Sequence, residues 1–97
     1  MYARVVRFQG SPEHMRERSS SRFREQVLPA GRQQSGFKAV YVLEDRAGGK
    51  RIGVSFWESE QDARNAAAGL DPFLVEAAAE IGAATPTAEL YEVVDQA

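Results

Sequence analysis

WESEQDA, at residues 57–63, joins an apolar strand to the start of a helix. The run 52–57 is predicted to be a strand, and it ends in Trp57, the only tryptophan of the chain. Ser59 is a favoured N-cap residue, and Asp62 three positions later nearly completes a capping box. The junction therefore holds a large amphipathic ring where a strand meets a helix, a place where ligand sites form.

The segments on both sides of this junction alternate between strand and helix. Aromatic and β-branched residues indicate the strands, and Ser-Pro and Asp-Pro pairs indicate helix starts. The order β-α-β-β-α-β predicts an α+β fold of the ferredoxin-like type, with a four-stranded antiparallel sheet. A chain of 97 residues is expected to form a single domain, 1–97. The predicted strands are 2–8, 37–44, 51–57 and 87–94, and the predicted helices are one from Pro12 onward, 60–68 and 73–81.

Two prolines are predicted to interrupt helices, because proline lacks the N–H that the helix ladder needs. Pro29 is expected to end or kink the first helix, with a further turn reaching Gln34. Residues 69–72 are expected to break the second helix, so that Asp71 and Pro72 cap and begin a third one. The first helix is predicted to bury one narrow stripe, made of Met15, Ser19, Phe23 and Val27.

The composition excludes several kinds of site. A chain without cysteine and with one histidine has no usual zinc site, and no glycine-rich nucleotide-binding motif is present. Ser19 to Ser21 are predicted to lie within a helix without a neighbouring base, which disfavours nucleophilic catalysis. The chain has no signal peptide and no apolar run near 20 residues, so we expect a soluble cytoplasmic protein without a membrane partner.

Charge is unevenly distributed along the chain. Residues 1–32 contain seven arginines and three glutamates, whereas residues 57–97 contain nine acidic residues and one arginine. A nucleic-acid surface is one interpretation, but the arginines alternate with glutamates and no nucleic-acid-reading motif accompanies them. We therefore expect no nucleic-acid partner, and mutual attraction of the two segments within or between subunits.

Both faces of the predicted sheet are apolar. Strand residues alternate between the faces, which places Phe37, Ala39, Tyr41 and Leu43 on one face of the second strand and Val40 and Val42 on the other. Two helical segments cover only one face in this topology. The second face needs a cover, and the same face of another copy is the simplest one, which predicts a homodimer through the sheet.

Four short pieces occur in order along the chain: Ser35-Gly36-Phe37, the hairpin leading to Trp57, Trp57-Glu58-Ser59-Glu60, and Asp71-Pro72-Phe73. In these pieces, and over nearly its whole length, the chain resembles the antibiotic biosynthesis monooxygenase domain family of the dimeric α/β-barrel superfamily. The resemblance implies that the sheets of two subunits form a barrel, and that each subunit has a ligand cleft between its sheet and helices.

The resemblance also implies pocket residues. Trp57 and Phe73 match family pocket positions, and the strand and helix pattern adds Phe23 and Tyr41 as neighbours. The alternative is that these aromatic residues only fill the core between helix and sheet.

The best-known chemistry of the family is oxygenation of aromatic phenols without metal or flavin. Such a protein has to bind the substrate, exclude water and assist deprotonation, so no cofactor or metal is expected. Tyr41, the Trp57 N–H, Arg4 and Tyr91 are the candidate polar groups, and no specific catalytic residue is identified. The alternatives are an edge-exposed arginine for Arg4 and a tyrosine of the dimer core for Tyr91.

A second family branch binds and degrades haem, and this chain departs from its pattern. That branch uses an asparagine on the first strand and a histidine four residues after the phenylalanine of the broken helix. In this chain the first strand has no asparagine, and the residue four positions after Phe73 is Ala77. The only histidine, His14, is predicted to be exposed in the first turn of a helix. Haem turnover is therefore not expected.

Three functions stay open at this point. The first is a cofactor-independent monooxygenase acting on a small phenol or quinol. The second is a non-catalytic homodimer that binds a small apolar molecule or serves as an accessory subunit. The third is a housekeeping protein whose pocket is filled by its own side chains.

Overall fold

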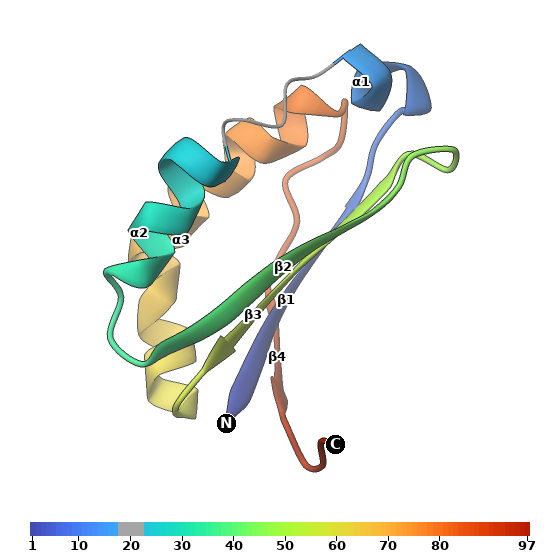
Figure 1. Ribbon diagram of the computed structural model, residues 1–97. Helices are drawn as coiled ribbons and strands as arrows, with labels where there is room; N and C mark the ends of the chain where they lie inside the picture. The colour runs from blue at the N-terminus through green and yellow to red at the C-terminus, as the bar shows by residue number, and fades with distance from the viewer. Residues whose placement is uncertain (18–22) are drawn as a thin grey trace.

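The computed structural model describes residues 1–17 and 23–97. In these ranges the chain forms one antiparallel sheet of order β2-β3-β1-β4, with helices packed against one side of it (Figure 1). This order confirms the predicted ferredoxin-like class. The elements are β1 (Tyr2–Gln9), α1 (Pro12–Glu17), the π-helix η1 (Phe23–Val27), α2 (Leu28–Arg32), β2 (Phe37–Asp45), β3 (Lys50–Trp57), α3 (Glu60–Glu80) and β4 (Glu89–Glu92).

The second helical segment is one continuous helix, which corrects the predicted break. α3 runs from Glu60 to Glu80 with Pro72 inside it, and it curves over the sheet (Figure 1). Pro72 removes one hydrogen bond of the ladder, but α3 places Leu70 before it and Ala78 after it in two buried clusters. Packing on both sides of the proline therefore outweighs the lost bond.

Both ends of α3 follow the sequence prediction. The Ser59 hydroxyl accepts a hydrogen bond from the Asp62 amide at 3.1 Å. At the other end Gly82 takes a φ of 69°, and the Ala83 amide donates to the Ala78 carbonyl at 2.9 Å. This Schellman arrangement needs a residue that tolerates positive φ, and glycine provides it.

The first helical segment is described in two parts. α1 comprises Pro12–Glu17, and from Phe23 onward η1 passes directly into α2. Pro29 lies in the first turn of α2 and does not end the helical segment, which continues to Arg32. Of the predicted inner stripe, Ser19 lies outside the described residues.

A register shift on β2 corrects the predicted face of Phe37. The shift falls between Phe37 and Ala39, and it pairs Phe37 with Trp57. The two rings meet edge to face, with centroids 5.6 Å apart. A bulge of this kind reverses the side of the residue before it, so Phe37 packs with the helices while Tyr41 stays on the opposite face.

Two apolar clusters lie between sheet and helices. The Trp57 cluster comprises Trp57, Ala63, Ala66 and Leu70. The Ile81 cluster comprises Val6, Phe8, Met15, Ala78 and Ile81. We call the side of the sheet that carries both clusters the helix-facing side.

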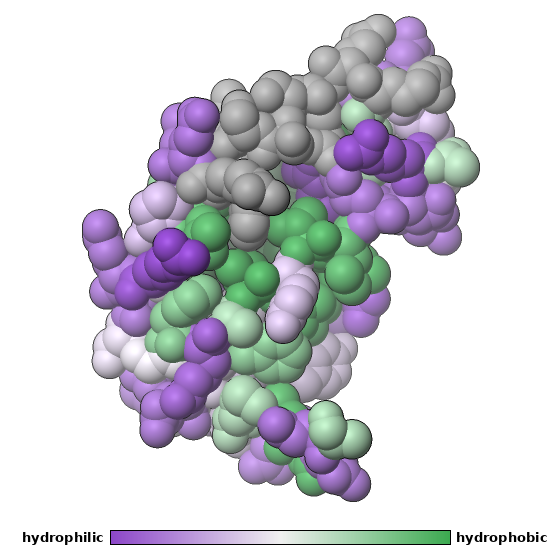
Figure 2. Space-filling model, viewed as in Figure 1, coloured by the Kyte–Doolittle hydropathy of each residue, from purple (hydrophilic) through white to green (hydrophobic). Residues whose placement is uncertain are grey.

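The other side of the sheet, the open face, has no helix over it in Figure 1. Figure 2, in which the edge strand β2 is toward the viewer, shows apolar surface in the middle of the view, over β2 and toward the helices. Three large side chains of the open face, Tyr41, Leu43 and Tyr91, are about half exposed. The register places the following residues on the open face: Ala3, Val5, Arg7, Ala39, Tyr41, Leu43, Ile52, Val54, Phe56, Glu89 and Tyr91.

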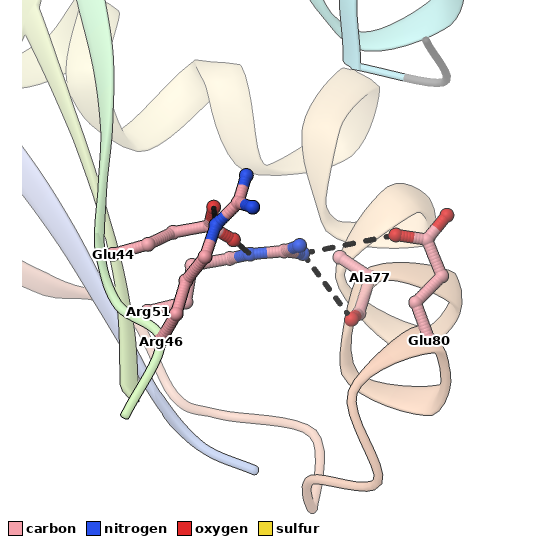
Figure 3. A network of polar contacts seen from close by, with 5 residues as sticks. All are labelled: Glu44, Arg46, Arg51, Ala77 and Glu80. Atoms are coloured by element: carbon pink, nitrogen blue, oxygen red, sulfur yellow. Dashed lines mark hydrogen bonds and ion pairs between the residues drawn. The ribbon is translucent and has the colours of Figure 1, made fainter. Parts of the chain in front are cut away.

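A charged network holds the β2–β3 hairpin against the end of α3 (Figure 3). Arg51 Nε donates to Glu44 Oε2 at 3.0 Å, and Arg51 Nη1 donates to the Ala77 carbonyl at 3.5 Å and lies 3.8 Å from Glu80 Oε2. The Arg51 side chain is buried, so these contacts replace the water that its charge loses.

None of the helices in the described ranges has the length and apolarity that crossing a bilayer requires.

Candidate functional site

A polar seam separates the two apolar clusters on the helix-facing side. It consists of Arg4 on β1, Ser55 on β3 and Asp71 on α3. Arg4 Nη2 donates to Asp71 Oδ1, and these side chains are 5% and 51% exposed respectively. A buried guanidinium thus lies next to a carboxylate that reaches the surface.

Arg4 is a central residue of the sheet, which corrects the edge-exposed alternative. Its strand β1 lies between β3 and β4, and Arg4 pairs with Ser55 on one side and Leu90 on the other. Residue 4 faces the helices because Tyr2 and Val6, two positions away on the same strand, pack in the two clusters. The charge therefore lies between two apolar regions.

Ser55 links the seam to the tryptophan ring. The Trp57 Nε1–H donates to Ser55 Oγ at 2.9 Å, and the Ser55 hydroxyl donates to the Arg4 carbonyl at 3.4 Å. Trp57 is fully buried by side chains of this chain. In this structure the ring is part of the core next to the polar seam, and its N–H has a hydrogen-bond acceptor in Ser55.

The part of the sheet next to the polar seam carries small residues on its helix-facing side. Gly53, two positions before Ser55 on the same side of β3, has no side chain, and it pairs with Val42 of β2. Val42 is 39% exposed although it lies on the helix-facing side. The described helices therefore leave β2 incompletely covered here.

The structure divides the predicted site residues between the two sides of the sheet. Arg4 and Trp57 lie together on the helix-facing side, and Phe73 is half-buried in α3. Tyr41 and Tyr91 lie on the open face, where Tyr41 packs edge to face on Phe56 with ring centroids 6.3 Å apart. They are not brought together with Trp57.

Two further predictions concern Phe23 and His14. Phe23 begins η1, and its side chain is outside the part of the chain that the structure describes. His14 is exposed on α1 beside Gly82. In residues 1–17 and 23–97, no three histidine or acidic side chains gather as a metal site would require.

Sequence reasoning missed Asp71 and Ser55 as site residues. Asp71 was interpreted as the cap of a separate helix, and this interpretation hid a side chain that reaches Arg4 across 67 positions of sequence. Ser55 lies two residues from Trp57 on the same side of a strand, and this spacing is the signal by which it was detectable.

A second polar group lies on the open face. The Tyr91 hydroxyl donates to Glu89 Oε1 at 2.6 Å, and Arg7 Nε donates to Glu89 Oε2 at 3.2 Å. The hydrogen bond from Tyr91, followed by the one from Arg7, lowers the pKa of Glu89. The hydrogen bond to Glu89 in turn raises the pKa of Tyr91. The Arg7–Glu89 and Arg4–Asp71 pairs show that the basic and acidic segments attract each other within the chain.

Replacing Tyr91 with phenylalanine is expected to raise the pKa of Glu89 toward its ordinary value, because the strongest stabilisation of the carboxylate is removed. The folded pKa of Glu89 is depressed, so its contribution to stability is present above the unfolded pKa and is lost as pH falls through the folded pKa. Carbon-detected NMR titration of the Glu89 carboxyl measures the shift. Arg7→Gln is the comparison, and a larger shift in Arg7→Gln than in Tyr91→Phe would contradict the assignment.

No family model and no curated protein matches this sequence. Solved structures do match. A monooxygenase from Streptomyces coelicolor, in complex with nanaomycin D, is 22% identical with a TM-score of 0.71, over 99% of this chain and 89% of that chain. SnoaB, a cofactor-independent oxygenase from Streptomyces nogalater, is 21% identical with a TM-score of 0.64, over 98% and 94%.

A third match is a variant of MhuD with two manganese protoporphyrin IX molecules in each active site. It is 19% identical with a TM-score of 0.70, over 100% of this chain and 98% of that chain. Similarity over nearly the full length of chains at this level of identity shows a shared fold. The resemblance to antibiotic biosynthesis monooxygenase-type proteins is therefore confirmed at the level of the fold.

Proposed function

We propose that this protein is a cofactor-independent monooxygenase that acts on a small phenol or quinol. Its fold is shared with a cofactor-independent oxygenase and with a monooxygenase that binds nanaomycin D. The polar seam is the observation that carries the proposal, because it provides one buried cation between two apolar clusters. An aromatic ring suits the apolar clusters, and an oxygen anion on that ring suits Arg4.

The chemistry requires little from the protein. The ligand loses a proton to water, and Arg4 stabilises the resulting phenolate, whose conjugated carbanion then donates electrons to O₂. A carbon–oxygen bond forms, the peroxide anion takes up a proton from water, and the hydroperoxide loses water. In an anthrone the reacting CH₂ carbon loses both hydrogens, keeps one oxygen atom as a ketone and releases the other as water.

The haem chemistry of the related branch is not part of this proposal. Ala77, at the position of that branch's histidine, packs against the Ile81 cluster and has no side-chain atom that ligates iron. His14 is on α1, where it neighbours Gly82 rather than the seam.

The proposal includes a homodimer formed through the open face, with the two sheets closing a barrel. Support comes from Tyr41, Leu43 and Tyr91, which leave an apolar area exposed on one side of a small chain. A cytoplasmic location also belongs to the proposal, and the absence of cysteine is compatible with it.

Oxygen consumption with 1,8-dihydroxyanthrone or a naphthohydroquinone tests the function. We expect uptake above the protein-free rate of autoxidation, and a loss of at least about tenfold in Arg4→Gln. Trp57→Phe is expected to reduce uptake as well, because the N–H that orients Ser55 is lost. Arg7→Gln is the matched control, since Arg7 lies on the same strand but on the open face, and we expect it to retain the wild-type rate.

The outcomes separate the three functions that the sequence left open. Uptake at the protein-free rate with measurable binding of the aromatic compounds favours a non-catalytic binding protein. Absence of both uptake and binding favours a protein whose interior is filled by its own side chains, as the burial of Trp57 allows.

A further inference from the structure

Arg4 has more hydrogen-bonding capacity than its partners among the described residues use. A guanidinium carries five N–H donors and stays charged in proteins. Within residues 1–17 and 23–97, Asp71 is the one acceptor of these donors, although Arg4 is almost fully buried. Burial of a charge is costly unless its donors are satisfied. The arrangement therefore has unused capacity for a second anionic or polar oxygen.

Asp71 differs from Arg4 in its access to solvent. Half of its side chain is exposed, while the side chain of Arg4, which it contacts, is almost fully buried. An exposed carboxylate loses little by separating from its partner, because water solvates it again. A ligand anion that approaches from the side of Asp71 therefore reaches Arg4 by replacing a weakly held internal partner.

The surroundings of the pair fit an aromatic anion better than a mineral anion. Ser55 and Leu90 flank Arg4 on the neighbouring strands, and Trp57 and Leu70 begin the apolar cluster next to it. A phosphate or sulfate would place its unpaired oxygens against these apolar side chains. An aryl carboxylate or phenolate has one anionic end for the guanidinium and an apolar body for the cluster.

We propose that Arg4 binds the carboxylate or phenolate of an aromatic ligand, and that Asp71 is an internal counter-ion which this ligand displaces. The proposal rests on the proposed function, because it concerns the same site, and it adds Asp71 as a competing residue and a carboxylate as a second anionic group that Arg4 accepts. Asp71 keeps the guanidinium paired in the absence of ligand and lowers the affinity for anions by competing with them.

Isothermal titration calorimetry with 2-naphthoate and 2-naphthamide tests this at neutral pH. The two probes share shape and differ in charge. We expect the wild-type protein to bind 2-naphthoate about tenfold more tightly than 2-naphthamide. Asp71→Asn is expected to bind 2-naphthoate about three- to tenfold more tightly than wild type, with unchanged affinity for 2-naphthamide, since a half-exposed competing ion pair is removed.

Glu58→Gln is the matched control for Asp71→Asn. It removes the same charge from an exposed acid, which pairs with Lys38 at 3.0 Å rather than with Arg4. We expect it to leave both affinities unchanged. Arg4→Gln is expected to bind the two probes equally. If Arg4→Gln does not fold, Arg4→Lys and Asp71→Asn carry the test, and the lysine variant is expected to retain the preference for the anion.

The anion site would be overturned if the wild-type protein bound both probes equally or bound neither. It would also be overturned if Asp71→Asn bound 2-naphthoate as tightly as the wild type or more weakly. Failure of the oxygenase function is a separate result. Charge-selective binding without oxygen uptake keeps Arg4 as the anion site and removes the oxygenase. Oxygen uptake from a neutral hydroquinone with no charge preference in binding keeps the oxygenase and removes the anion site.

Discussion

Trp57→Ala is expected to lower the free energy of unfolding by about 3 to 5 kcal/mol. The ring is fully buried, and it packs on Ala63, Ala66 and Leu70 of α3. Two of these neighbours are alanines, whose short side chains cannot move into the space that the ring leaves. The substitution also removes the hydrogen bond of 2.9 Å that the Ser55 hydroxyl accepts from the indole N–H.

Chemical denaturation followed by circular dichroism measures this loss, at one fixed protein concentration because association changes apparent stability. Val94→Ala is the control, since Val94 is exposed near the C-terminus, and we expect a change within about 0.5 kcal/mol. A loss well below 1 kcal/mol in Trp57→Ala would mean that the ring borders an open or solvent-filled space. That result would favour a ligand-lining role for Trp57 over a core role.

The wild-type chain is expected to have about twice its 10.7 kDa mass in solution, and Leu43→Asp is expected to reduce it to 10.7 kDa. Leu43 lies on the open face beside Tyr41 and opposite Ile52, in the area that a second copy would cover. A carboxylate at this position would be buried without a partner in the dimer, so we expect dissociation to be favoured at least about 100-fold.

Light scattering at micromolar concentration measures the mass, and circular dichroism checks that Leu43→Asp stays folded. Val75→Asp is the matched control, because Val75 is an exposed apolar residue on α3 rather than on the open face, and we expect it to remain dimeric. A monomeric wild-type protein, or equal dissociation of the two variants, would contradict the dimer through the sheet.

The secondary structure of this protein follows from local signals, with instructive exceptions. The cap at Ser59 and the end at Gly82 depend on residues within one turn of the chain, and both were predictable. Pro72 carries an equally strong local signal, yet it does not end α3. Its effect depends on whether packing on both sides compensates one lost hydrogen bond, and this is a property of the tertiary structure.

The pairing of strands was likewise predictable from the sequence in one part and not in another. The alternation of β3 predicted which of its residues share a face, and the structure keeps Ile52, Val54 and Phe56 together. The alternation of β2 failed at Phe37, because the bulge inserts one residue and reverses the side before it. A bulge is specified by the fit to a partner strand, which the sequence of one strand does not contain.

The sequence by itself determined the order of strands and helical segments, the cap at Ser59, the end at Gly82, and the burial of one tryptophan at the end of β3. These properties depend on near neighbours, whose interactions survive in any compact arrangement of the chain. Only the tertiary structure placed Arg4 in the centre of the sheet, brought Asp71 to it from 67 positions away, and moved Tyr41 and Tyr91 to the opposite face from Trp57. The physical reason is that such contacts depend on strand order and on the path of α3 over the sheet, which are set by the packing of the whole chain.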